Sequence, residues 1–282
     1  MNPTPSNPRF AFFGTPVFST FVLHELVSNG YVPNLIVTTP DKPAGRGLEI
    51  VQSPVKKFAL EQNIPVLQPE VLNEHFIAEL KKRNIDLLVV AAYGKILPSA
   101  VLDIGKVPPL NVHPSLLPKY RGTSPVESQI LAGEEEVGVT IIQMDEKMDH
   151  GPIVAQEKVS VSKQSTRDEL NRILWTRGGQ ILSEIIPSWI AGNKTPTPQD
   201  HSQATFTKKI SKEDGEVSLS DDPVILDRKF RAYHPWPGLY FYTNRNGTRT
   251  RVKIKTARWE NEQFIIETVI PENGKPMPFS AL

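Results

Sequence analysis

Cysteine is absent from this chain of 282 residues. Without a thiol the protein can form no disulfide framework, no thiolate-bound zinc site and no cysteine nucleophile. The absence also agrees with a reducing compartment, where disulfides do not persist, so we expect the protein in the cytoplasm.

Charge of one sign and long apolar runs are scarce as well. The net charge is only +1, so a nucleic-acid partner would have to be held by a local basic surface. No apolar run approaches the roughly 20 residues that cross a bilayer. The start, MNPTPSNPRF, lacks the apolar stretch of a signal peptide. We therefore expect no membrane partner, and a disordered lead over residues 1–8.

Two nucleotide-binding motifs are missing. The sequence contains neither G-x-G-x-x-G nor G-x-x-x-x-G-K-[ST], so Gly14 predicts a tight strand-to-helix turn and no phosphate loop. The histidines, at positions 24, 75, 113, 150, 201 and 234, show no metal-ligand spacing. The sequence predicts neither a dinucleotide nor a bound metal.

What is present is an alternation of strand and helix patterns over residues 9–190. Short apolar runs predict strands over 9–13, 35–39, 65–67, 86–92, 110–113, 139–144 and 153–161. Helical patterns cover 17–29, 55–62, 73–83 and 166–190, with Gly178-Gly179 a candidate interruption. Residues 40–53 predict a polar loop. This alternation predicts an α/β domain with a doubly wound, mostly parallel, Rossmann-like sheet.

The remaining third of the chain has a different sequence pattern. Residues 191–207 have no hydrophobic period and predict a linker. Beyond it, Asp222 predicts the cap of a helix over 222–233. Strand patterns follow over 239–243, 249–259 and 264–270, the first two joined at Asn246-Gly247. We therefore predict a second, smaller and mostly β domain over residues 208–282.

Two polar residues stand out in the apolar strand 110–113. Asn111 and His113 are two positions apart, so they point to the same face of the sheet. They lie at the end of the strand, where open α/β sheets form their clefts. Spacing alone leaves two interpretations open, a reactive pair or a structural hydrogen bond that fixes the following loop.

A loop with three carboxylates follows the strand 139–144. It reads Met144-Asp145-Glu146-Lys147-Met148-Asp149-His150-Gly151. Taken alone, such a loop is typical of solvated surface.

Together the two segments resemble the folate-dependent formyltransferases. That family has an N-x-H-x-S-L-L-P strand and loop, followed further along by a D-x-G loop. The matching residues here are Asn111, His113, Ser115–Pro118 and Asp149–Gly151. The resemblance implies 10-formyltetrahydrofolate as donor and Asn111, His113 and Asp149 as catalytic residues. It also implies a folate site at Ala92, Tyr93, Gly94, Ser115, Leu116, Leu117, Pro118, Met144 and Asp145.

The implied roles agree with the chemistry of formyl transfer. An amine that attacks a formyl carbon creates an oxyanion, which needs hydrogen-bond donors. The Asn111 amide and a protonated His113 ring are such donors. Asp149 can accept the proton that the amine loses. No covalent intermediate is required.

Three features resemble the family members that formylate initiator methionyl-tRNA. The string Asp41–Gly47 resembles their inserted loop, with Lys42 and Arg46 as implied RNA contacts. Segments 209–215 and 231–238 resemble the start of their C-terminal OB-like domain, a scaffold that often binds nucleic acid. Basic residues also alternate along one expected strand, which places them on one face: Arg249, Arg251, Lys253 and Lys255. Phosphate would neutralise that face, although exposed strands also carry Lys and Arg for solubility.

Two other functions stay open. One is the same chemistry on a nucleotide-linked amino sugar, which would not need the loop at Lys42–Gly47. The other is a non-catalytic RNA-binding protein on the same scaffold. The sequence departs from the family pattern at Lys147, where relatives usually carry glycine, and it ends soon after Phe279, earlier than many relatives. We expect a monomer.

Overall fold

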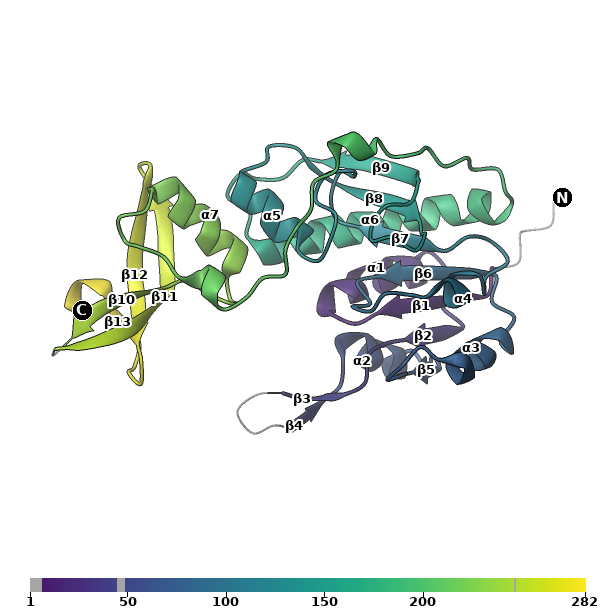
Figure 1. Ribbon diagram of the computed structural model, residues 1–282, viewed down its shortest axis with the longest axis horizontal. Coiled ribbons are helices and arrows are strands. Elements are labelled where there is room, and N and C mark those ends of the chain that lie inside the picture. The colour runs from purple at the N-terminus through teal and green to yellow at the C-terminus, as the bar shows by residue number, and fades with distance from the viewer. Residues whose placement is uncertain (1–6, 45–48, 246) are drawn as a thin grey trace. The chain divides into compact units, whose positions relative to one another are not determined.

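The computed structural model describes residues 7–44, 49–245 and 247–282 (Figure 1). The chain forms two compact units whose segments alternate along the sequence. Unit 1 comprises Met1–Arg121, Gly138–Val159 and Asn171–Phe206, and unit 2 comprises Gly122–Val137, Ser160–Leu170 and Thr207–Leu282. Most of the expected disordered lead lies outside the described residues. Within the described ranges, no helix is long and apolar enough to cross a membrane.

Unit 1 is built on a seven-stranded sheet with the order β5-β2-β1-β6-β7-β8-β9. Pairing is parallel from β5 through β7 and antiparallel between β7 and β8, which confirms the predicted α/β fold class. The strands are β1 (Phe10–Gly14), β2 (Leu35–Val37), β5 (Val66–Leu67), β6 (Leu87–Ala91), β7 (Leu110–His113), β8 (Val137–Gln143) and β9 (Ile153–Val159).

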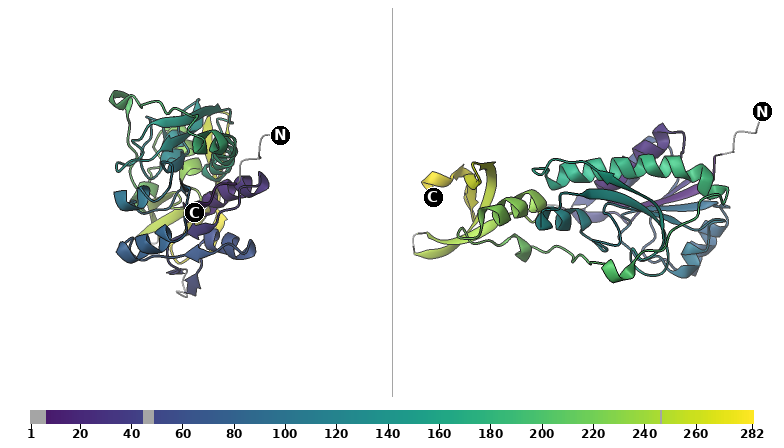
Figure 2. Two further views of the ribbon diagram at one scale, coloured as in Figure 1. Left: turned by 90° about the vertical axis from the view of Figure 1, so that its right-hand side faces the viewer. Right: turned by 90° about the horizontal axis from the view of Figure 1, so that it is seen from above.

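Helices cover both faces of this sheet, as the two views of Figure 2 show. On one face α1 (Val17–Ser28), α2 (Pro54–Glu61) and α6 (Arg167–Ile190) pack against alternate strand residues such as Phe10 and Phe12. On the other face α3 (Glu74–Lys81) and α4 (Ser99–Leu102) pack against the intervening residues, such as Ala11 and Phe13. The strand period of two therefore divides one apolar run between two cores.

Two of the helix starts follow from their caps. Ser53 Oγ accepts a hydrogen bond from the Lys56 backbone N at 3.0 Å, and Pro54 occupies the first helical position of α2. Asn73 Oδ1 accepts from the Phe76 backbone N at 3.1 Å at the start of α3. Both caps satisfy a backbone donor that the first turn of a helix leaves free.

The expected interruption at Gly178-Gly179 is wrong, because α6 is continuous. A Cβ on Gly178 would lie 2.5 Å from Val112 Cγ1, and one on Gly179 would lie 3.0 Å from the Val22 Cα. The two glycines therefore let the helix lie close to β7 and α1. Close packing in the folded state outweighs the low helix propensity of glycine.

The predicted loop over residues 40–53 is also partly wrong. Its described residues include a two-stranded antiparallel hairpin of β3 (Lys42–Ala44) and β4 (Glu49–Val51). Lys42 lies on β3 and is exposed, whereas Arg46 lies outside the described residues.

Unit 2 contains a four-stranded antiparallel sheet, in agreement with the predicted β-rich C-terminal part. Its strands are β10 (Tyr240–Arg245), β11 (Thr248–Glu260), β12 (Gln263–Pro271) and β13 (Met277–Pro278). Its helices α5 (Pro125–Ala132) and α7 (Pro223–Tyr233) pack against each other. Asp222 caps α7 as predicted, accepting from the Val224 backbone N at 2.7 Å. Arg245 pairs with Thr248 across the hairpin; the predicted turn residue Asn246 lies outside the described residues.

The predicted linker, residues 191–207, runs along unit 1 for most of its length. Thr197 and Ile153 exchange two backbone hydrogen bonds of 2.7 and 2.8 Å, and the Arg121 N donates to the Thr205 carbonyl at 2.9 Å. A short 3₁₀ turn, His201–Gln203, lies between these contacts. The boundaries of the two domains stay a prediction.

Candidate active site

Strand β7 places Asn111 and His113 on one face of the sheet. Asn111 pairs with Val90 of β6 and with Ile142 of β8, so it lies on an interior strand of the sheet. Its exposed fraction is 9%, and that of His113 is 4%. Two polar side chains are thus held in a buried position on a strand that is otherwise apolar.

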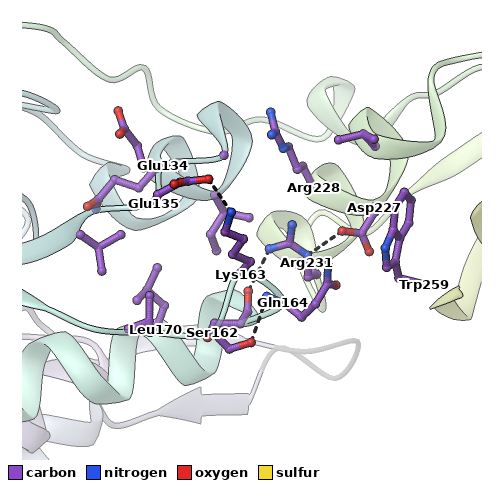
Figure 3. A pocket seen from close by; sticks show the side chains of 17 residues that line it. Glu134, Glu135, Ser162, Lys163, Gln164, Leu170, Asp227, Arg228, Arg231 and Trp259 are labelled. Carbon is purple, nitrogen blue, oxygen red and sulfur yellow. Dashed lines mark hydrogen bonds and ion pairs between the residues drawn. The ribbon is translucent and has the colours of Figure 1, made fainter. Parts of the chain in front are cut away.

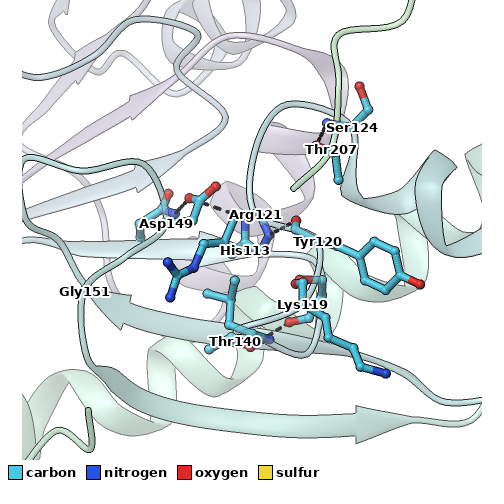
Figure 4. Close-up of polar contacts among 12 residues, drawn as sticks. His113, Lys119, Tyr120, Arg121, Ser124, Thr140, Asp149, Gly151 and Thr207 are labelled. Atoms are coloured by element: carbon cyan, nitrogen blue, oxygen red, sulfur yellow. Dashed lines mark hydrogen bonds and ion pairs between the residues drawn. The ribbon is translucent and has the colours of Figure 1, made fainter. Parts of the chain in front are cut away.

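Asp149 comes to the same place from the loop after β8. Its Oδ1 lies 3.5 Å from Asn111 Nδ2 and 3.5 Å from His113 Nδ1 (Figure 4). The structure therefore brings together the three residues that the sequence predicted as catalytic, although 38 positions separate Asn111 from Asp149.

His113 has an oxygen beside each of its ring nitrogens. Nε2 lies 3.0 Å from the Tyr120 carbonyl oxygen, and Nδ1 faces the Asp149 carboxylate. A ring that carries a proton on both nitrogens can donate to both oxygens. Both ring nitrogens therefore have an oxygen within reach, and the ring can act as a hydrogen-bond donor.

The loop after β7 is fixed by hydrogen bonds to β8. Ser115 Oγ donates to the Lys119 carbonyl at 2.7 Å, and Thr140 Oγ1 donates to the Ser115 carbonyl at 2.6 Å. The Leu117 backbone N donates to Thr140 Oγ1 at 3.2 Å. The Ser115 hydroxyl is thus used inside the loop, so the predicted folate wall Ser115–Pro118 offers mainly backbone and apolar surface.

The loop that carries Asp149 has an unusual backbone. Asp149 has φ 50°, a left-handed conformation that costs free energy for most residues and that aspartate tolerates better than most. At Gly151 an added Cβ would clash with the Gln143 carbonyl oxygen, so only glycine fits there. This close approach explains the glycine of the D-x-G pattern.

Within that loop, Asp145 makes two contacts that stabilise the loop conformation. Its Oδ2 lies 2.6 Å from His150 Nδ1, and its Oδ1 accepts from the Lys147 backbone N at 2.9 Å. Lys147 is exposed and does not have a positive φ. The departure from glycine at Lys147 is therefore accommodated without backbone strain.

The predicted pterin loop after β6 presents backbone to its surroundings. Ala92 and Gly94 have φ of 52° and 82°. The Tyr93 ring is buried edge-on against Phe13, its hydroxyl has no hydrogen-bond partner among the described residues, and burial raises the pKa of Tyr93 to about 12. Tyr93 can therefore contact a ligand only through its main chain. Met144, which follows β8, packs against the same apolar cluster as Tyr93.

Sequence reasoning missed two buried side chains beside the Asp149 loop. Gln199 Nε2 donates to the carbonyl oxygens of Asp149 and Gly151 at 2.9 and 2.7 Å, and Arg121 Nη2 donates to Gln199 Oε1 at 2.6 Å. Gln199 lies 50 positions after Asp149, in a segment with the composition of a linker. No motif or period marks it.

The basic strand face predicted in the C-terminal part is present in unit 2. Arg249, Arg251 and Lys253 are exposed on β11 and alternate with buried Val252 and Ile254. Lys255 is exposed too, but it occupies a β-bulge, since Ile254 pairs with Val269 and Thr256 with Thr268. The alternation thus holds for three of the four residues.

Two tyrosines that the sequence analysis overlooked share this face. Tyr242 pairs with Arg251 and Tyr240 pairs with Lys253 across the hairpin. The Arg249 guanidinium lies 4.1 Å from the centre of the Tyr242 ring. Their spacing of two along β10 was a usable signal.

Unit 2 also holds a cavity of about 190 Å³ that contains none of the predicted site residues (Figure 3). Two ion pairs lie among the charged side chains that line it. Arg231 Nε donates to Asp227 Oδ2 at 2.8 Å, and Lys163 contacts Glu135. In the described part of the chain, no group of three His, Asp or Glu residues is placed to hold a metal ion.

The fold and the geometry of the site indicate a class of reaction. Asparagine and histidine donors with a carboxylate, at the end of a central strand in an α/β sheet, suit the transfer of an acyl group to an amine. The chain belongs to the formyl transferase family. Residues 8–186 match the family's catalytic part, described as formyl transferase, and residues 209–275 match the formyl transferase C-terminal domain. The resemblance seen in the motifs is confirmed.

Relatives of known activity cover most of the chain. A methionyl-tRNA formyltransferase of Chloroflexus aurantiacus is 44% identical over 235 residues, which is 83% of this chain and 76% of the relative. One from Enterococcus faecalis is 37% identical over 272 residues, covering 95% and 86% of the two chains.

Solved structures with the same fold are more distant in sequence. The methionyl-tRNA formyltransferase of Clostridium thermocellum has a TM-score of 0.64 at 15% identity, and the match covers 94% of this chain and 99% of that one. An N-formyltransferase of Helicobacter canadensis, solved with folinic acid and dTDP-3-aminofucose, has a TM-score of 0.63 at 19% identity and covers 92% and 95%. These likenesses support the fold.

Proposed function

We propose that this protein transfers the formyl group of 10-formyltetrahydrofolate to the amino group of methionine on initiator methionyl-tRNA, in the cytoplasm, for translation initiation. The observation that carries the proposal is that the Asp149 carboxylate lies 3.5 Å from both the Asn111 amide and the His113 ring. The activity named for the relatives of 37–45% identity supports the choice of acceptor.

Asn111 and His113 supply the hydrogen-bond donors for the reaction. Both face Asp149 Oδ1 at 3.5 Å, the long limit of a hydrogen bond. Their N–H groups can therefore turn toward a formyl oxygen without breaking a strong bond. As the amine attacks, that oxygen becomes negative, and donors already in place stabilise it.

Asp149 moves the proton. The new carbon–nitrogen bond leaves the amine with a proton to lose, and the Asp149 carboxylate accepts it. The same proton can then pass to the carrier nitrogen as its bond to the formyl carbon breaks. This sequence balances without a covalent enzyme intermediate.

The donor fits the backbone-lined region between the loops after β6 and β8. The main chain at Ala92 and Gly94, in left-handed conformations, can approach a flat heterocycle closely. Ser115–Pro118, Met144 and Asp145 complete this region. Folate in a related protein, the folinic acid bound to the Helicobacter canadensis enzyme, supports this class of donor.

The exposed face of β10 and β11 fits the tRNA. Arg249, Arg251, Lys253 and Lys255 provide charge for phosphates. The rings of Tyr240 and Tyr242 lie among them and can stack on unpaired bases. Lys42 and Arg46, from the predicted inserted loop, are proposed as further RNA contacts.

One experiment tests the acceptor. The protein is incubated with 10-formyltetrahydrofolate and, in turn, with charged initiator tRNA, a nucleotide-linked amino sugar and no acceptor, while release of tetrahydrofolate is followed by absorbance. We expect rapid turnover only with the tRNA. If formyl transfer occurs only with the amino sugar, the protein is a formyltransferase that acts on nucleotide-linked sugars. If no acceptor is formylated, the result favours a non-catalytic RNA-binding protein. Gel filtration tests the expected monomer.

A further inference from the structure

The segment after α6 reaches back to the catalytic loop through one buried side chain. Gln199 is 6% exposed. Its Nε2 donates to two carbonyl oxygens of the same loop, those of Asp149 at 2.9 Å and Gly151 at 2.7 Å. One amide group thus ties together both ends of the Asp149-His150-Gly151 turn.

The orientation of this amide is fixed by a buried cation. Arg121 is 3% exposed, and its Nε and Nη2 donate to Gln199 Oε1 at 3.2 and 2.6 Å. A guanidinium can only donate hydrogen bonds, so the amide oxygen must face Arg121 and the amide nitrogen must face the loop. Arg121 Nη2 also lies 2.9 Å from His201 Nδ1.

His201 is a second hydrogen-bond partner of the Arg121 guanidinium. Desolvation lowers the pKa of His201, and the charges of His150 and Arg121 lower it further. A neutral His201 can accept a hydrogen bond at Nδ1 from the Arg121 guanidinium. Arg121 is thereby held on two sides.

The loop needs such support because of its backbone. Asp149 is in the left-handed region at φ 50°, a conformation that persists only where surrounding contacts determine it. The Asp149 carboxylate, in turn, meets Asn111 and His113 at 3.5 Å. A shift of about 1 Å at a reacting group costs on the order of 100-fold in rate.

We propose that Gln199, oriented by Arg121, is a positioning residue for formyl transfer that holds the Asp149 carboxylate beside His113. This inference rests on the proposed function. Gln199 acts through the backbone of the loop, because its amide bonds to the carbonyl oxygens of Asp149 and Gly151.

The test is Gln199→Glu, which has nearly the same shape. The new carboxylate keeps an acceptor for Arg121 and forms an ion pair with it, but it has no N–H for the Asp149 and Gly151 carbonyls. We expect kcat to fall about 10- to 100-fold, with KM for both substrates within about threefold of the wild type. We expect the melting temperature to stay close to the wild-type value. If this variant does not fold, Gln199→Asn, whose shorter amide cannot span all three partners, is measured in the same way.

The matched control is Ser183→Ala. Ser183 is also buried in unit 1 and also donates to a carbonyl, that of Gly179 at 2.9 Å, but within α6. Its kcat is expected to equal that of the wild type. If the wild type transfers formyl to tRNA and Gln199→Glu does so with unchanged kcat, or loses no more than the control, the role of Gln199 is refuted alone. A wild type without formyl transfer overturns the proposed function together with it.

Discussion

Replacing Asp149 by asparagine is expected to slow formyl transfer by about 10²- to 10⁴-fold, the contribution typical of a positioned general base. This loss corresponds to an increase of roughly 3–5 kcal/mol in the activation free energy. The new amide has the shape of the carboxylate, and its oxygen can still face Asn111 and His113. Because both contacts are already long at 3.5 Å, weakening them adds little, and the missing proton acceptor dominates.

Single-turnover kinetics with charged initiator tRNA measures this effect directly. The KM for the folate donor should stay within about threefold of the wild type, since Asp149 is not assigned to donor binding. Glu146→Gln is the matched control, because it removes the same charge from an exposed position on the same loop. An Asp149→Asn enzyme that retains wild-type turnover, or one slowed no more than Glu146→Gln, would refute the assignment of Asp149 as the base.

Three further predictions concern RNA contact, loop packing and stability. Replacing both Arg249 and Arg251 by Gln should raise the KM for tRNA and reduce the slope of log affinity against log salt by about 2, with kcat unchanged; an unaltered slope counts against phosphate contact. Gly151→Ala should lower kcat more than tenfold while the donor still binds, because the added Cβ displaces the catalytic loop; a fully active variant would contradict this. The Lys106 hydrogen bond lowers the pKa of Asp86, whose ordinary value is 3.8, so the ionised carboxylate stabilises the fold above that pH and loses its effect as the pH falls further. Denaturant titrations should therefore show Asp86→Asn less stable than the wild type near neutrality and the difference shrinking toward about pH 3.

The sequence allowed the strand that carries Asn111 and His113 to be predicted with its observed ends, Leu110–His113. Its apolar positions alternate with two polar ones, and the family motif made the polar pair specific. Asp149 was found through the same motif. The residues proposed to act on the substrate thus left a recognisable pattern in the chain.

The residues that support the site left no such pattern. Gln199 lies in a stretch with no hydrophobic period, and its partners are two carbonyl oxygens, which every residue type has. The continuity of α6 could not be predicted either, because glycine has a low helix propensity. The helix continues through Gly178 and Gly179 because it packs closely against Val112 and Val22 there. In both cases the deciding contact forms between segments far apart in the chain.

The alternation of the two units along the chain bears on how the protein is made. Helix α5, at Pro125–Ala132, packs within unit 2 against α7, at Pro223–Tyr233. A ribosome must add about ninety further residues before that partner emerges. Until then the apolar side of α5 stays uncovered on the nascent polypeptide, so N-terminal fragments that stop before α7 should aggregate even though most of the parallel sheet is already complete.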